Sequence, residues 1–229
     1  MLFIIGIFFM IASMIAGWRL KKKFKKYAEI RLGSGLSGRE IAELMLKDNG
    51  IYDVQVMSVE GQLTDHYNPM NKTVNLSHDV YHGRSAAAAA VAAHECGHAV
   101  QHATAYSFLE FRSAMVPIQN ISGTIMNVVM MIAIFGGSFL MGMGYENILF
   151  ILIACQTVIT LFTLVTLPVE YDASNRALAW ITSRNIVNAE EHAMAKDALN
   201  AAASTYLIAA LGAVTTLVFY ILMMLGGRE

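Results

Sequence analysis

The chain has 229 residues, of which 56% are apolar and only 14% are charged. Soluble domains carry about 25% charged residues, so this composition excludes an ordinary soluble protein. The apolar content also excludes intrinsic disorder, and two cysteines are too few for a disulfide-stabilised secreted scaffold. The 16 basic and 17 acidic residues nearly cancel, so their positions are more informative than their sum. We therefore expect an integral membrane protein.

Four apolar stretches are long enough to cross a membrane as helices, which takes about 20 residues each. They are residues 1–18, 124–144, 148–167 and 206–225, and the middle two form a hairpin over residues 124–167. The first stretch has no basic segment before it and no small-residue cleavage site. We therefore expect an uncleaved membrane anchor rather than a signal peptide.

The basic residues predict the orientation of these stretches. Fifteen of the 16 fall within residues 19–123 and 168–205, and the tip at residues 145–147 has none. The positive-inside rule then places both segments in the cytoplasm, with the chain as a multi-pass protein of the plasma membrane. A nucleic-acid-binding patch is the alternative interpretation, but it does not explain this sidedness. We expect the lipid bilayer, and no nucleic acid, as a partner.

The segment 19–123 contains signals for a small mixed α/β fold. Ser37 and Glu40 form a capping box that predicts a helix ending at Asn49-Gly50. Alternating residues predict a strand at 53–56, and two further strands at 63–67 and 73–77 flank a turn as a hairpin. An alanine run after Ser85 predicts a helix that reaches about Ala105.

That alanine-rich helix carries the sequence His94-Glu95-Cys96-Gly97-His98. Histidines four residues apart lie on one helix face, so both imidazoles can reach one metal ion. Glu95 projects about 100° away around the helix, where it can deprotonate a water molecule at the metal without binding the metal itself. The pattern is typical of zinc hydrolases. We expect Cys96 to be a packing residue.

A catalytic zinc site requires a third protein ligand. His102 lies one turn further along the same helix, but three ligands on successive turns would be nearly collinear, so we expect His102 to be a polar neighbour. The topology favours Glu170, because residues 168–205 return to the same side of the membrane as the histidine helix. Pro168 predicts a kink or a new helix start just before it. The pair His78 and His82 has the same spacing but is expected to be a surface feature.

Several stretches together resemble the bacterial YugP-type membrane zinc metallopeptidases, distant relatives of the HtpX and CAAX prenyl protease type glutamate zincins. The resemblance covers nearly the whole chain and is carried by residues 63–69, 74–77, 93–102 and 166–174. It implies a bacterial protein with one Zn²⁺ per chain, His94, His98 and Glu170 as ligands, and Glu95 as catalytic base.

One position departs from the pattern of the wider glutamate zincins. They place an aspartate four residues after the ligand glutamate to orient a zinc histidine, and here that residue is Ser174. Asp172 is the nearest carboxylate but faces another way on a helix. Candidates to orient a ligand or to stabilise the oxyanion are therefore His66, His102, Asp172 and Ser174, together with Tyr67, Tyr81, Tyr106 and Tyr171.

The sequence thus predicts a mainly α-helical integral membrane protein with four transmembrane helices and a small α+β zincin-like catalytic domain in the cytoplasm. We expect a zinc endopeptidase that cleaves membrane-associated or misfolded proteins and binds extended peptide on an edge strand of the hairpin. Self-assembly or a membrane partner protein is compatible with this function. The alternative is a catalytically silent zinc-binding scaffold or adaptor, but Glu95 would have no purpose there.

Overall fold

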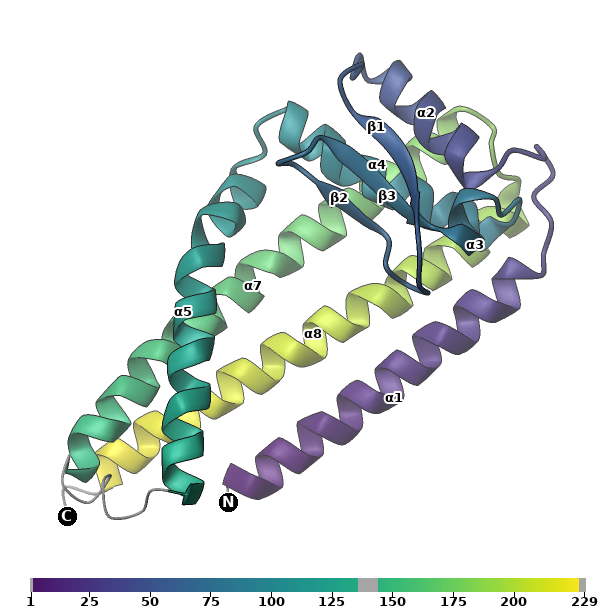
Figure 1. The fold of residues 1–229 in the computed structure, drawn as a ribbon. Coiled ribbons are helices and arrows are strands. Elements are labelled where there is room, and N and C mark those ends of the chain that lie inside the picture. Colours follow the sequence, from purple (N-terminus) through teal and green to yellow (C-terminus); the bar gives the residue numbers. More distant parts are fainter. Residues whose placement is uncertain (1, 136–143, 227–229) are drawn as a thin grey trace. The chain divides into compact units, whose positions relative to one another are not determined.

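The computed structural model describes residues 2–135 and 144–226, which are mainly helical with one small sheet (Figure 1). The helices are α1 (Leu2–Ala28), α2 (Gly38–Asp48), α3 (His78–Tyr81), α4 (Ala86–Ala103), α5 (Ser107–Phe135), α7 (Tyr145–Ser183) and α8 (Ala189–Gly226). The strands are β1 (Gln55–Val59), β2 (His66–Asn68) and β3 (Thr73–Ser77).

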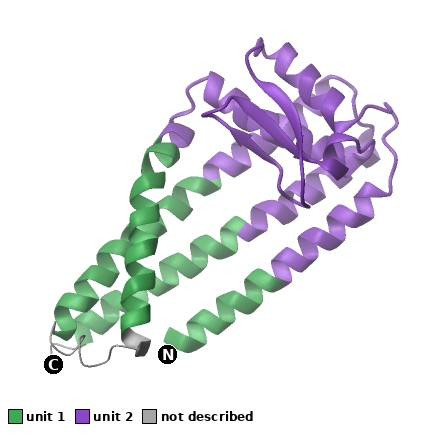
Figure 2. Ribbon diagram, in the orientation of Figure 1, with its two compact units in different colours: residues 1–14, 111–167, 206–229 green, residues 15–110, 168–205 purple. Residues whose placement is uncertain are grey.

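The chain divides into two compact units (Figure 2). One comprises residues 1–14, 111–167 and 206–229, and the other comprises residues 15–110 and 168–205. The second unit contains the sheet, α2, α3 and α4, together with parts of α1, α5, α7 and α8. All of the residues predicted to carry the chemistry belong to this second unit.

Four of the described helices are long and apolar enough to cross a membrane, by length and composition alone. They are Leu2–Ala28, Ser107–Ile132, Tyr145–Ser183 and Ala189–Gly226. Each overlaps one predicted stretch, so the expectation of four candidate membrane helices is confirmed. Residues 136–143, which belong to the second predicted stretch, lie outside the described residues. The cytoplasmic placement and the boundaries with the membrane stay predictions.

Helix α7 continues through Pro168 without interruption, so a new helix does not begin at this proline. Proline removes one helical hydrogen bond and crowds the preceding turn, but the long apolar helix tolerates this local cost. As a result, Glu170 lies in the interior of a regular helix. Its position is therefore set by the way α7 packs.

Helices α2 and α4 begin where the sequence predicts. Ser37 caps α2, and its capping box with Glu40 is complete in both directions. The helix ends at Asn49, and Gly50 follows with a φ of 70°, which suits glycine. The Ser85 side chain accepts a hydrogen bond from the Ala88 N–H at the start of α4. These predicted helix ends are confirmed.

The sheet has the order β1-β3-β2, with β3 fully buried at the centre. The hairpin is confirmed, because β2 pairs with β3 in antiparallel orientation. Its first strand begins only at His66, because Leu63 has a φ of 57°, which a strand does not accept. The remaining predicted strand, 53–56, is shifted: β1 covers Gln55–Val59 and pairs parallel to β3.

Alanine-rich α4 lies at the centre of the second unit and is almost entirely buried. The core around it is formed by apolar side chains of α2, β3, α7 and α8, including Ile41, Met45, Leu76, Ile181 and Leu199. Small alanine side chains allow neighbouring backbones to approach closely. The two strands β2 and β3 also contact α4 (Figure 1). This arrangement places the histidine helix between the sheet and α7.

Candidate metal centre

The two histidines of α4 lie side by side on one face of the helix, as their spacing predicts. The ring centroids of His94 and His98 are 4.7 Å apart, and the rings are nearly perpendicular at 82°. Both side chains are largely withdrawn from solvent, with exposed fractions of 14% for His94 and 11% for His98.

Glu170 of α7 completes a compact group with these histidines. Its Oε2 atom is 3.3 Å from His94 Nε2 and 3.7 Å from His98 Nε2. The candidate ligand atoms of the three residues all lie within 4.8 Å of one another. The Glu170 side chain is 5% exposed. The structure therefore brings together two imidazole nitrogens and one carboxylate in a nearly buried cluster.

Gly97 explains how α4 and α7 approach closely enough to form this cluster. A Cβ atom at this position would lie 2.6 Å from the carbonyl oxygen of Ala173 and 3.1 Å from its Cα. These are backbone atoms, which cannot move aside without moving α7. The glycine between the two histidines therefore permits the helix contact on which the Glu170 position depends.

Glu95 is buried but is not one of the three candidate ligands, in keeping with its place on the helix. Its Oε2 atom accepts a hydrogen bond of 2.9 Å from the backbone N–H of Tyr67 in β2. The sheet thus holds the carboxylate at a defined position. Sequence reasoning did not anticipate this contact, because it joins residues 28 positions apart.

Each histidine also has a partner behind it, at Nδ1. Ser174 Oγ lies 3.1 Å from His94 Nδ1, and Gln101 Oε1 lies 3.0 Å from His98 Nδ1. Ser174, four residues after Glu170, thus contacts a histidine of the cluster. Asp172 does not contact the histidines directly, but accepts a 2.8 Å hydrogen bond from Gln101 Nε2.

Gln101 was not among the residues singled out from the sequence. The available signal is its spacing, since it follows Ala93 and Gly97 at intervals of four residues along the buried face of α4. A fully buried amide on a face of small apolar residues needs hydrogen-bonding partners. Those partners are the cluster itself and α7.

The carboxylates around His98 change the pKa of its imidazole. Burial would lower the pKa of His98, but the hydrogen bond with Glu170 and the charges of Glu95 and Glu170 raise it above its usual value. The site is thus one that favours positive charge. Cys96, by contrast, is fully buried, and burial raises the pKa of its thiol well above the usual range. This agrees with a packing role for the cysteine.

The remaining candidates from the sequence, two histidines and four tyrosines, make other contacts. His66 is engaged on the hairpin: its Nδ1 is 2.8 Å from the carbonyl oxygen of Thr64, to which it must donate, and its Nε2 faces Asn75. Tyr67 Oη is 2.8 Å from His102 Nδ1, so these two candidates contact one another. Of the other tyrosines, Tyr81 lies beside Arg39, Tyr106 lies beside Arg176, and Tyr171 is exposed.

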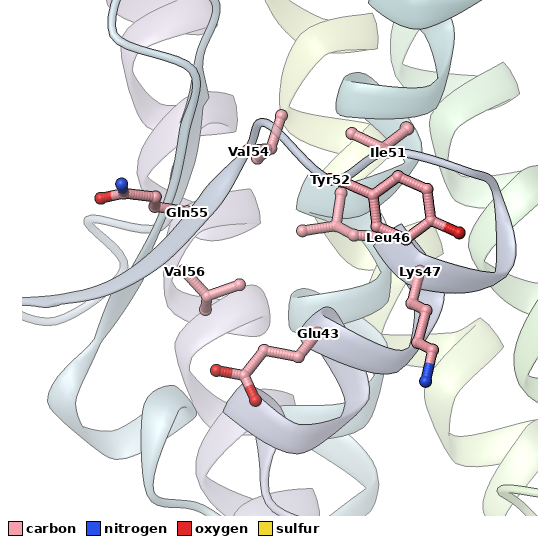
Figure 3. A pocket seen from close by; sticks show the side chains of 8 residues that line it. All are labelled: Glu43, Leu46, Lys47, Ile51, Tyr52, Val54, Gln55 and Val56. Carbon is pink, nitrogen blue, oxygen red and sulfur yellow. The ribbon is translucent and has the colours of Figure 1, made fainter.

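A surface cavity of about 510 Å³ lies between α2 and β1 (Figure 3). Its apolar floor includes Leu46, Ile51 and Val56, and its charged groups are Glu43 and Lys47. None of the candidate metal-binding or catalytic residues lines it. The cavity therefore adds nothing to the chemistry of the cluster.

The chain is similar to known zinc metallopeptidases and membrane proteases. The model of the family described as "putative neutral zinc metallopeptidase" matches residues 2–225. The match covers nearly the whole sequence, so the chain belongs to this family, and the resemblance seen in the sequence is confirmed. The chain is also 38% identical over 217 residues to "Putative membrane protease YugP" of Bacillus subtilis (strain 168), covering 95% of this chain and 93% of that protein. No solved structure matches the chain significantly.

The residues of the cluster fit the zinc that the family name implies. Two histidine nitrogens and one carboxylate are a donor set used by zinc hydrolases. Both Nδ1 atoms are engaged by Ser174 and Gln101, so both Nε2 atoms are directed towards Glu170. Such partners behind ligand histidines are usual at metal sites.

Proposed function

We propose that the chain is a zinc-dependent endopeptidase of the glutamate zincin type. In this proposal His94, His98 and Glu170 bind one zinc ion, and Glu95 is the general base. The observation that carries the proposal is the convergence of three ligand atoms within 4.8 Å, next to a buried carboxylate that does not belong to the group. The family match supports the same chemistry.

A zinc ion bound at this cluster would supply Lewis acidity towards a peptide carbonyl and a water molecule. The side chains of the protein carry out the proton transfers. Glu95 accepts a proton from the attacking water and returns it to the leaving amine, which is a general acid–base cycle. Its hydrogen bond from Tyr67 N–H keeps the carboxylate in one orientation during both transfers.

The number of ligands favours catalysis over a purely structural metal. Structural zinc sites are closed by four protein ligands, often cysteines. In the part of the chain that the structure describes, the group contains three histidine or acidic residues and no cysteine. Cys96 Sγ instead lies 3.6 Å from the carbonyl oxygen of Ala42. A zinc ion held by these three residues would keep a coordination position for water or substrate.

The edge position of β2 supports binding of an extended peptide. β2 pairs with β3 on one side only, and its Tyr67 N–H reaches Glu95. A peptide that lies beside this strand would pass close to the general base. Backbone pairing of this kind provides affinity with little selectivity for side chains, which suits misfolded proteins as substrates.

The predicted topology suggests where the substrates come from. Glu170 follows the predicted membrane stretch 148–167 by only a few residues, and the positive-inside pattern puts this end in the cytoplasm. Membrane-associated proteins would then be presented to the site at high effective concentration. We therefore propose cleavage of membrane-associated or misfolded proteins at the cytoplasmic face.

The test is proteolysis of a loosely folded protein such as casein by the purified full-length chain, with Glu95→Gln beside it. We expect Glu95→Gln to keep its zinc and to lose about 10²- to 10⁴-fold in kcat/KM, the contribution typical of a general base. Glu43→Gln is the control, because Glu43 is an exposed carboxylate paired with Arg39 on α2.

Equal activity of Glu95→Gln and the wild-type protein would contradict the peptidase proposal. A wild-type protein that binds zinc tightly but cleaves none of the substrates tested would favour the scaffold alternative instead.

A further inference from the structure

Gln101 connects the candidate metal centre to a charged pair on α7. Its Oε1 atom faces His98 Nδ1 at 3.0 Å, and its Nε2 atom is 2.8 Å from both Val169 O and Asp172 Oδ2. The side chain is completely buried. The Gln101 amide therefore makes three hydrogen bonds, and all three partners are protein atoms.

These partners determine which way the amide points. The carbonyl oxygen of Val169 can only accept, and the Asp172 carboxylate also accepts from Arg176 Nε at 2.6 Å. Both partners therefore require the NH₂ group of Gln101. The oxygen of the amide must then face His98, so His98 Nδ1 must carry the proton.

A proton on Nδ1 leaves Nε2 of the neutral imidazole with its lone pair, and Nε2 is the atom that faces Glu170. We propose that Gln101, anchored by Asp172, is a positioning residue that holds His98 in the tautomer and orientation needed to bind the metal. This inference rests on the proposed zinc site and adds the group that prepares one of its ligands.

Asp172 cannot perform this task by itself. It is two residues from Glu170 on α7, so it projects from a different side of the helix. The glutamine bridges this separation, while Arg176 holds the carboxylate one turn further along. The chain of contacts therefore runs from His98 through Gln101 to Asp172 and Arg176.

The experiment measures zinc affinity of the full-length protein in detergent by competition with a chromophoric chelator, and the visible spectrum of the Co²⁺-substituted protein. Gln101→Met keeps the volume of the side chain but removes both hydrogen-bonding groups. We expect it to bind zinc about 10- to 100-fold more weakly, as is typical when a partner behind a ligand histidine is lost, with an altered Co²⁺ spectrum.

Two variants of Asp172 separate positioning from general stability. Asp172→Ala should weaken zinc binding, whereas Asp172→Asn should bind zinc nearly as well as the wild type, because its amide oxygen still accepts from Gln101. Asp172 is 30% exposed, so both variants are expected to fold even if Gln101→Met does not. Gln156→Met is the matched control, since Gln156 is a buried glutamine that donates to Ala213 O in the other unit.

The outcomes are distinguishable. If the wild-type protein binds zinc and both Gln101→Met and Asp172→Ala bind it equally well, with the same Co²⁺ spectrum, the inference is wrong while the proposed function stands. If the wild-type protein binds no zinc, the proposed metal site fails and this inference fails with it. Weaker binding in Gln101→Met and Asp172→Ala, but not in Asp172→Asn or Gln156→Met, supports the inference.

Discussion

Two histidine pairs in this chain have the same spacing and the same ring separation but different surroundings. His78 and His82 lie at α3, and His94 and His98 lie on α4; in both pairs the ring centroids are 4.7 Å apart. The sequence interval therefore produces the same ring separation twice, although the rings meet at 53° in the α3 pair and at 82° in the α4 pair.

The difference lies in what surrounds each pair. The His78 side chain is 75% exposed, and the carboxylate near it, that of its neighbour Asp79, is 4.0 Å away and 62% exposed. The α4 pair is largely buried, faces Glu170 from another helix, and has Ser174 and Gln101 behind its rings. A helical interval places two rings together, but a metal site also requires a third ligand, burial and oriented nitrogens.

The largest effect is expected from removing the α4 pair. His94→Ala with His98→Ala should abolish zinc binding and proteolysis, because two of the three proposed ligands are lost. The double variant His78→Ala with His82→Ala should keep both properties at the wild-type level. Zinc content of the purified proteins by mass spectrometry checks this prediction. Loss of zinc from the α3 variant would show that the exposed pair binds metal as well.

A smaller effect is expected when the close contact between α4 and α7, which brings Glu170 next to the two histidines, is disturbed. Gly97→Ala would place a Cβ atom 2.6 Å from Ala173 O, so α4 and α7 must separate and move Glu170 from the histidines. We expect a loss of stability of about 1–3 kcal/mol, the usual cost of overpacking, together with weaker zinc binding.

Gly123→Ala is the control for this variant. Gly123 lies in α5, and a Cβ atom there would meet nothing within 4 Å. Replacing a helical glycine by alanine is expected to leave stability unchanged or raise it by up to about 1 kcal/mol. Thermal unfolding of both variants measures the difference. Equal stability of Gly97→Ala and the wild type would show that the close approach is not required.

The smallest effect is expected from replacing Ser174. This variant compares the two residues behind the histidine rings, Ser174 at His94 and Gln101 at His98. The Ser174 hydroxyl can donate or accept, so it does not impose one tautomer on His94 as Gln101 does on His98. Ser174→Ala should cost about 0.5–1.5 kcal/mol of zinc-binding free energy, the net value of one hydrogen bond. Competition titration with a chelator measures it. A larger loss than that of Gln101→Met would reverse this ranking.

Local interactions made much of the fold predictable. The capping contacts of Ser37 and Ser85 span three residues, and the helices that begin there were predicted from the capping box at Ser37 and from the alanine run after Ser85. The four candidate membrane helices follow from composition over about 20 residues. The beginning of β2 was predicted too early, because the left-handed backbone at Leu63 has no signal in a run of strand-forming residues. The parallel pairing of β1 and β3 was not predicted, since nothing local specifies it.

The candidate site was predictable as a set of side chains but not as an arrangement. Spacing singled out His94, Glu95 and His98, and topology favoured Glu170. The contact of Ser174 with His94 joins residues 80 positions apart, and that of Gln101 with Asp172 joins residues 71 positions apart. Their geometry depends on how α4 and α7 pack, which no local pattern encodes.

The sequence by itself determined the membrane-protein class, the presence of the ligand types and their common face on one helix, because these follow from composition and helical periodicity. Only the tertiary structure decided how the His94 and His98 pair gains a buried carboxylate and oriented Nε2 atoms. The physical reason is the close approach of two helices at Gly97 and Ala173. That contact places the side chains of α7 against the histidine face of α4.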